Sequence, residues 1–172
     1  QKVRIIEALQ HAGAAAGPAV LAHLDAQTHV PQELADLVGH LRLSSAMDHL
    51  IRWTGDSNPA LRAAAFRAIG ILGPDERAYY HALKALGDDD ADVRAMAARA
   101  LGRAGLGAAV PYLSAQLDNE WKVAVEAALS LRALGPLGFA ALESRAAGEG
   151  DAADLAKHVL WEGRLHATAG NP

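Results

Sequence analysis

The sequence has no cysteine, few aromatic residues and no long apolar run. Without cysteine the chain carries no disulfide, no thiolate nucleophile and no thiolate-bound zinc. Aromatic residues make up only 5% of the chain, although 51% of it is hydrophobic. The core must therefore consist of small and aliphatic side chains, which suit closely packed helices better than a β-sandwich. No apolar stretch reaches the roughly 18 residues that a membrane-spanning helix needs.

The charges and the missing motifs exclude further classes of function. A net charge of −4 argues against a surface that is basic throughout, while a local basic patch stays compatible with it. The chain has no glycine-rich phosphate loop, no G-x-S-x-G elbow and no H-E-x-x-H motif. We therefore expect no enzyme activity and no cofactor. Because the chain starts at Gln1 within an expected helix, we expect a fragment of a longer protein. We place it in the cytoplasm or at the cytoplasmic face of a membrane, with any anchor outside this fragment.

One pattern recurs along the chain: acidic residues, a helix with paired alanines, and a closing glycine. It is clearest in "DSNPALRAAAFRAIGILG" (56–73) and in "DDDADVRAMAARALGRAG" (88–105), which lie 32 residues apart. A third copy starts at Asp118, 30 residues after Asp88. A helix pair of about 30 residues cannot bury its apolar face alone, so repeated pairs must stack on their neighbours.

The ends of these helices carry typical capping residues. Asp56 or Asn58 precedes Pro59, and Asp90 precedes the next helix, as expected of N-caps and a first-turn proline. A glycine such as Gly105 follows each helix and can end it in the left-handed conformation. The pattern predicts eleven helices in a half repeat (1–13), repeats at about 14–42, 43–73, 74–105, 106–135 and 136–163, and a flexible tail (164–172).

The stretch 88–105 resembles the bacterial HEAT repeat of the phycobilisome-lyase type. The resemblance lies in the acid-x-acid-x-x-Val-Arg entry, the paired alanines and the Leu-x-x-x-Gly exit. It is strong over 50–135 and weaker over 1–49 and 136–163. It implies an all-α, right-handed solenoid of about five and a half antiparallel helix pairs, which serves as a non-enzymatic scaffold for a partner protein or peptide. Lyase activity is not implied, because the repeat occurs in many proteins without it.

The resemblance also implies a structural ladder between the turns of adjacent repeats. In the family, aspartate and arginine side chains join these turns. Ala124 stands where the last arginine should be, and Trp121 is a candidate to cover that turn by packing. The ladder positions in this chain are Asp56, Arg62, Asp88, Arg94 and Asp118.

The second helix of each repeat lines the concave side of such arrays. At 100° per residue, Arg99 and Arg103 lie opposite the buried face of their helix, whereas Arg94 lies at its flank. Arginine anchors beside apolar contacts are typical of protein interfaces. Exposed charges that serve solubility alone are the competing interpretation. The register predicts a partner-binding surface made of Arg67, Ile71, Arg99, Arg103, Lys122 and Leu129.

A nucleic-acid or phosphate-binding groove is the alternative function. The same arginines, with Lys122, could contact phosphates. However, Glu7, Asp36 and Glu126 border the patch, and no aromatic residue on the expected surface could stack on bases. We therefore expect a protein partner in preference to a nucleic acid.

A metal-dependent oxygenase is a weaker alternative. It would use the carboxylate–histidine pairs Glu7/His11 and Asp36/His40 on neighbouring helices. The deoxyhypusine hydroxylases are HEAT-repeat enzymes of this kind. Their His-Glu dipeptide is absent from this chain, so we expect no metal site.

The aromatic residues offer few candidates for an exposed patch. We expect most of them to pack between the helical layers, and we expect Trp121 alone to be exposed, because it lies at a turn. The residues expected to be packed are Trp53, Tyr79, Tyr80, Tyr112 and Trp161.

Overall fold

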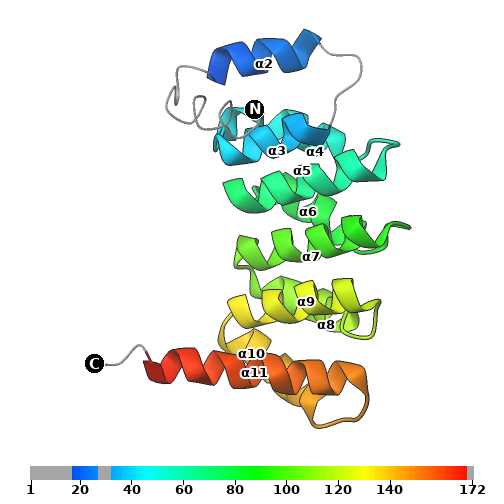
Figure 1. Cartoon of the computed structure of the whole chain (residues 1–172), viewed down its shortest axis with the longest axis vertical. Coiled ribbons are helices and arrows are strands. Elements are labelled where there is room, and N and C mark those ends of the chain that lie inside the picture. The colour runs from blue at the N-terminus through cyan, green and yellow to red at the C-terminus, as the bar shows by residue number, and fades with distance from the viewer. Residues whose placement is uncertain (1–16, 27–31, 170–172) are drawn as a thin grey trace.

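A computed structural model describes residues 17–26 and 32–169 of the chain (Figure 1). Over these residues the structure contains ten α-helices, two short 3₁₀-helices and no strand, which confirms the all-α prediction. No helix among them is long and apolar enough to cross a membrane. The α-helices are α2 (Gly17–Ala26), α3 (Gln32–His40), α4 (Met47–Trp53), α5 (Pro59–Leu72), α6 (Glu76–Ala85), α7 (Ala91–Ala104), α8 (Val110–Ala115), α9 (Trp121–Ala133), α10 (Pro136–Ala146) and α11 (Asp151–Ala169), and the 3₁₀-helices are η2 (Ser44–Ala46) and η3 (Gly107–Ala109).

The helices stack in chain order along the long axis of the molecule and form two layers (Figure 1). Helices α3, α5, α7, α9 and α11 contact one another in sequence, and we call them the second-helix layer. Helices α4, α6, α8 and α10 form the first-helix layer, and each packs against the helix that follows it. Every surface of the second-helix layer is thus assembled from segments about 30 residues apart in sequence.

Local signals account for the ends of the central helices. The side chain of Asn58 accepts a hydrogen bond from Ala60 N–H, with Pro59 in the first turn of α5. Asp90 caps α7 by accepting from the N–H groups of Asp92 and Val93. Gly105 ends α7 in the left-handed region, with φ 69°. Of the two candidate caps before α5, the structure selects Asn58.

Small residues let consecutive second helices approach closely. A methyl group on Gly39 of α3 would lie 3.0 Å from Ala68 Cα, and one on Gly102 of α7 would lie 2.6 Å from Ser130 Cβ. Gly70 occupies the equivalent place in α5, where Ala100 Cα would be 3.6 Å away. We call Gly39, Gly70 and Gly102 the glycine seam. Around it the core is aliphatic and alanine-rich, as the composition predicts.

The last helix is longer than the sequence pattern predicts. Helix α11 continues to Ala169, whereas we expected a flexible tail from residue 164. The segment that follows Gly163 contains one arginine, one leucine and two alanines, which favour helix, and no proline before the final residue. The predicted helix at 1–13 and the last residues of the predicted tail, 170–172, lie outside the described residues.

Three aromatic predictions are wrong. Trp53 and Tyr79 are buried as expected, but Tyr80, Tyr112 and Trp161 are 61%, 52% and 59% exposed. Consecutive residues point about 100° apart on a helix, so Tyr79 and Tyr80 cannot both face the core. Trp161 lines an open hollow between α11 and the end of α10 and is not packed between the two layers.

Candidate partner-binding surface

Arg99 and Arg103 lie on the solvent side of α7, as the register predicts. Both are exposed, and neither has a hydrogen-bond or ion-pair partner among the described residues. They line a hollow of about 410 Å³ between α7 and α9, which Leu129 and Glu126 also line. The structure thus brings three of the predicted surface residues together: two arginines and one leucine.

The other predicted surface residues are placed differently. Arg67 Nη1 lies 2.5 Å from Asp36 Oδ1, so the charge of Arg67 is compensated by the neighbouring helix α3. Ile71 lies near the end of α5 and is 38% exposed. Lys122 lies in the first turn of α9, where it forms an ion pair with Asp92, and it does not line the α7–α9 hollow. These three residues do not join the site around Arg99.

The described residues do not form the metal-binding pairs considered above. The Asp36 carboxylate pairs with Arg67, while His40 Nδ1–H donates to the Asp36 backbone carbonyl at 2.7 Å. Glu7 and His11 lie outside the described residues. Within the described part of the chain, no group of three or more His, Asp or Glu side chains is arranged to hold a metal ion.

One rung of the ladder forms as the family resemblance implies. Arg62 Nε and Nη2 donate to the two carboxylate oxygens of Asp88, at 2.9 and 2.7 Å. Arg62 Nη1 also donates to the backbone carbonyl of Asp56 at 2.9 Å. The hydrogen bond to Asp88 outweighs burial and raises the pKa of Arg62. The rung therefore ties the turn before α5 to the turn before α7.

The next rung uses a different acid from the one we predicted. Arg94 Nη2 donates to Glu120 Oε1 at 2.8 Å, and Asp118 is not its partner. The reason lies in the spacing, since both Arg62–Asp88 and Arg94–Glu120 are 26 residues apart. Aligning acids by the start of each helix chose the wrong residue, because the repeat from Asp88 to Asp118 is two residues shorter than the one from Asp56 to Asp88.

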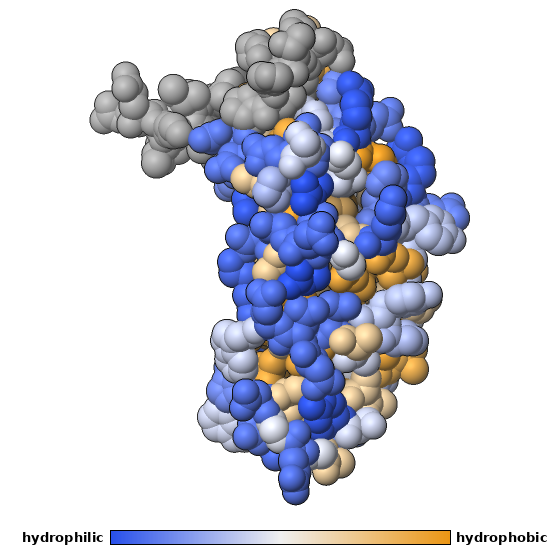
Figure 2. Space-filling model, turned by 90° about the vertical axis from the view of Figure 1, so that its right-hand side faces the viewer, coloured by the Kyte–Doolittle hydropathy of each residue, from blue (hydrophilic) through white to orange (hydrophobic). Residues whose placement is uncertain are grey.

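Asp118 instead binds an arginine that the sequence analysis missed. Arg145 Nη2 of α10 donates to Asp118 Oδ1 at 2.6 Å. This arginine supplies the positive charge that Ala124 cannot, so Trp121 is not needed to cover the turn. Trp121 is 65% exposed. These turns lie along the right-hand edge of Figure 1, and Figure 2 shows mostly hydrophilic residues down that edge with hydrophobic ones between them.

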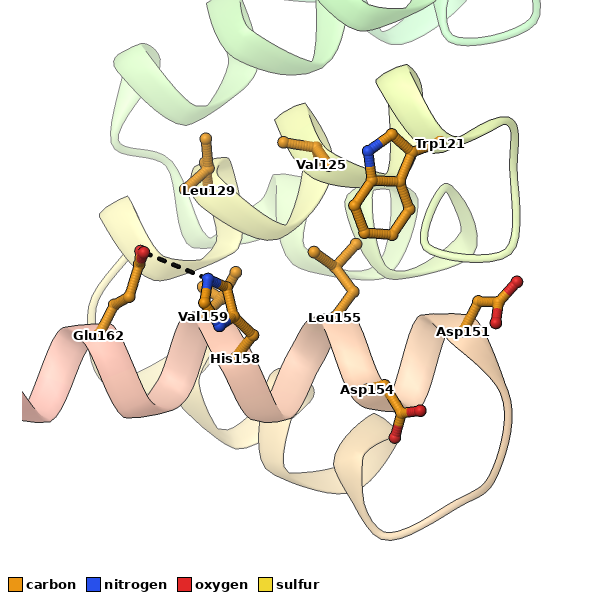
Figure 3. Close-up of a pocket in the computed structure, with 9 residues that line it drawn as sticks. All are labelled: Trp121, Val125, Leu129, Asp151, Asp154, Leu155, His158, Val159 and Glu162. Atoms are coloured by element: carbon orange, nitrogen blue, oxygen red, sulfur yellow. Dashed lines mark ion pairs between the residues drawn. The ribbon is translucent and has the colours of Figure 1, made fainter.

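A second hollow, also missed, lies between α9 and α11 (Figure 3). Its volume is about 790 Å³. The only signal for it in the sequence was the apolar spacing of Trp121, Val125 and Leu129 on one side of α9, at i, i+4 and i+8. We call this hollow the α9–α11 groove; it is lined by Trp121, Val125, Leu129, Asp151, Asp154, Leu155, His158, Val159 and Glu162.

Comparison with known proteins shows the fold of the chain. One solved structure that matches it is the complex of CpcE and CpcF of phycocyanin lyase from Nostoc sp. PCC7120, with a TM-score of 0.63. The chain has a phycocyanin-lyase-like fold. The match covers 90% of this chain and 68% of that chain at 20% sequence identity, so the likeness concerns the fold alone. The resemblance predicted from 88–105 is confirmed at this level. A scan against models of protein families and a search of curated proteins find no match.

Proposed function

We propose that this chain with a phycocyanin-lyase-like fold is a right-handed solenoid of about five and a half HEAT-like repeats. It binds a partner protein on the second-helix layer and has no catalytic activity of its own. In this proposal the repeated helix pairs hold a long surface semi-rigid through contacts between nearest neighbours. A lyase-related role within a protein complex is compatible with it, because the matched structure is itself a complex of CpcE and CpcF.

The observation that carries the proposal is that positively charged residues and an apolar surface lie next to each other on the second-helix layer. Leu129 lines both the α7–α9 hollow and the α9–α11 groove. The unpaired Arg99 and Arg103 therefore adjoin the groove that contains the exposed Trp121 through a shared residue, Leu129. Arginine and tryptophan are the residues most enriched among those that dominate binding energy at protein interfaces.

The test is an affinity pull-down from native lysate with the variant Arg99→Glu/Arg103→Glu. Arg67 is left unchanged, because its substitution would also break the ion pair with Asp36. We expect a partner bound by the wild type to be lost with this variant, by about tenfold or more, since reversing two interfacial charges costs more than about 1.4 kcal/mol.

The matched control is Arg52→Glu/Lys84→Glu, which makes the same change in net charge on two exposed residues of the first-helix layer. Retention of the partner by the control and its loss from the first variant would support the proposal. Recovery of the same proteins with both variants would contradict it.

The unpaired Arg99 and Arg103 are also compatible with the alternative function, binding of phosphate groups. The salt dependence of binding distinguishes the two functions. Binding driven by phosphate contacts weakens steeply as salt is added. A partner held largely by apolar contacts weakens much less. Pull-downs repeated across a salt series, with and without nuclease, would show which class of partner is retained.

A further inference from the structure

The α9–α11 groove exists because the glycine seam stops at α9. In the repeat register, Gly39, Gly70 and Gly102 are followed by Arg132. The Arg132 side chain lies across Gly163 of α11, 3.6 Å from the position a methyl group there would take, and pairs with Glu162 at 3.1 Å. A bulky side chain thus replaces the close contact between backbones. The hollow that the two helices leave beside this bridge is about 790 Å³, larger than the hollow of about 410 Å³ between α7 and α9, which approach closely at Gly102.

The walls and floor of the groove are apolar. Trp121, Val125 and Leu129 project from α9 above Leu155 and Val159 of α11 (Figure 3). Leu155 and Val159 are almost fully buried, at 5% and 2%, whereas Trp121 is 65% exposed. An indole this exposed beside an apolar floor makes no contribution to the core of the described structure. It has the surroundings of an interface anchor.

The rim of the groove is acidic. Asp151, Asp154 and Glu162 line it, and no lysine or arginine does. Asp151 has no partner among the described residues. Asp154 pairs with Lys157 across 2.9 Å, but both side chains are largely exposed. Such a pair contributes little free energy, so Asp154 can pair with a basic residue of a partner instead. Glu162 is already bound by Arg132 and by His158. The available negative charge therefore lies at the end nearest Trp121.

We propose that the α9–α11 groove binds an amphipathic helix of a partner protein, with the apolar stripe of that helix on Trp121, Val125 and Leu155 and its basic residues facing Asp151 and Asp154. The inference rests on the proposed function and names the chemistry of its partner.

The dimensions of the groove fit such a helix. Trp121 and Leu129 are eight residues apart on α9, which corresponds to about 12 Å. Two turns of a partner helix span that length and present three apolar side chains at i, i+4 and i+7. The N-terminal ends of α9 and α11 both lie at the Trp121 end, and their partial positive charge favours the C-terminal end of a partner helix there. The partner helix should therefore run antiparallel to α9.

The experiment uses two synthetic peptides with the same apolar stripe of leucines at i, i+4 and i+7. One peptide carries lysines in its C-terminal turn, and the other carries glutamates there. Binding of each fluorescein-labelled peptide to the full chain is measured by fluorescence anisotropy. We expect the lysine peptide to bind at least about tenfold more tightly than the glutamate peptide, because one or two favourable charge contacts account for a difference of that size.

Two variants test the site of binding. Val125→Lys places a charge on the apolar α9 side of the groove and should abolish binding of the lysine peptide. Its control, Leu137→Lys on exposed Leu137 of α10, should not. Asp151→Asn/Asp154→Asn should remove most of the preference for lysine. Its control, Glu76→Gln/Asp89→Asn, neutralises two exposed carboxylates elsewhere and should leave the preference intact. Circular dichroism confirms that each variant is folded.

Three results would overturn the inference: no binding of either peptide, equal binding of both, or binding that survives Val125→Lys. Sedimentation velocity tests whether a second copy of the chain occupies the groove instead. A wild-type dimer that becomes a monomer with Val125→Lys would assign the groove to that second copy. If the native partner is lost with Arg99→Glu/Arg103→Glu but retained with Val125→Lys, the inference fails while the proposed function stands.

Discussion

At the scale of single residues, two glycines at equivalent positions of successive repeats differ in the space around them. Gly70 and Gly102 both lie near the C-terminal end of a second helix, on the side that faces the next repeat. A methyl group on Gly70 would meet Ala100 at an ordinary contact distance of 3.6 Å. A methyl group on Gly102 would lie 2.6 Å from Ser130 Cβ and 2.8 Å from Ser130 Cα, so α7 and α9 would have to move apart.

These distances predict substitutions of opposite sign. Gly70→Ala should stabilise the protein by about 0.5–1 kcal/mol, because alanine is the better helix former and has room there. Gly102→Ala should destabilise it by about 1–3 kcal/mol, the usual cost of overpacking. Urea denaturation of both variants measures the two changes in the free energy of unfolding. A shift of the same sign in both would show that the spacing between second helices adapts freely.

At the scale of helices and turns, the Arg62–Asp88 rung couples neighbouring repeats. Burial tends to raise the pKa of Asp88, but the hydrogen bonds from Arg62 and from Asp90 N–H, with the charges of Arg62 and Arg94, outweigh it. The pKa is lowered from its ordinary value of 3.8. Because the pKa is lower in the folded state, the carboxylate contributes stability above the ordinary pKa. That contribution is lost as the pH falls through the folded pKa.

The wild-type protein should therefore lose stability as the pH is lowered from about 5 to about 3, and Asp88→Asn should lose less over the same range. Urea denaturation at a series of pH values gives the slope for each protein. Asp89→Asn is the control, because the Asp89 carboxylate makes no hydrogen bond or ion pair among the described residues. It should keep the wild-type slope. Equal slopes for wild type and Asp88→Asn would show that this rung does not govern acid stability.

The sequence was informative where local chemistry sets the structure. Caps such as Asn58 and Asp90, and the close of α7 at Gly105, follow from residue type and spacing, and the structure has them where they were expected. The starts of two helices of the first-helix layer could not be read from the repeat pattern. In the structure each begins as a 3₁₀ turn, and α4 and α8 cover only Met47–Trp53 and Val110–Ala115. Hydrophobic periodicity cannot distinguish such a tight turn from the helix that follows it.

The site was harder to predict because it depends on contacts between repeats. The exposure of Arg99 and Arg103 follows from the helical period, but the pairing of Arg67 with Asp36 joins two helices whose relative shift no local pattern fixes. The α9–α11 groove likewise depends on how α11 packs against α9, which no local pattern fixes. The replacement of the seam glycine by Arg132 was visible in the sequence and indicates where the close packing stops.

At the scale of the whole molecule, acidic and basic residues are unevenly distributed along the helices of the second-helix layer. The starts of the second helices carry the acids of the ladder and of the groove rim, such as Asp88, Glu120 and Asp151. Arg99, Arg103 and Arg132 lie farther toward the C-terminal ends. Acids at the N-terminal end and arginines toward the C-terminal end complement the helix dipole. Asp88 and Glu120 are paired with Arg62 and Arg94, so a partner would meet an unpaired acid of this set at Asp151 and unpaired arginines at Arg99 and Arg103.

The stacked architecture also predicts unequal protection of the helices against hydrogen exchange. Helix α7 packs against α5, α6 and α9, whereas α11 packs chiefly against α9 and α10. In a stack held by nearest neighbours, a helix covered on both sides opens only with its neighbours, while a helix covered on one side opens alone. Backbone amides of residues 95–104 should therefore exchange at least about tenfold more slowly than those of residues 155–163, a difference of about 1.4 kcal/mol in opening free energy. Hydrogen–deuterium exchange followed by mass spectrometry measures both segments in one experiment. Equal protection would mean that the helices unfold as a single cooperative unit, and in that case binding in the α9–α11 groove would stabilise α5 and α7 as much as α11 itself.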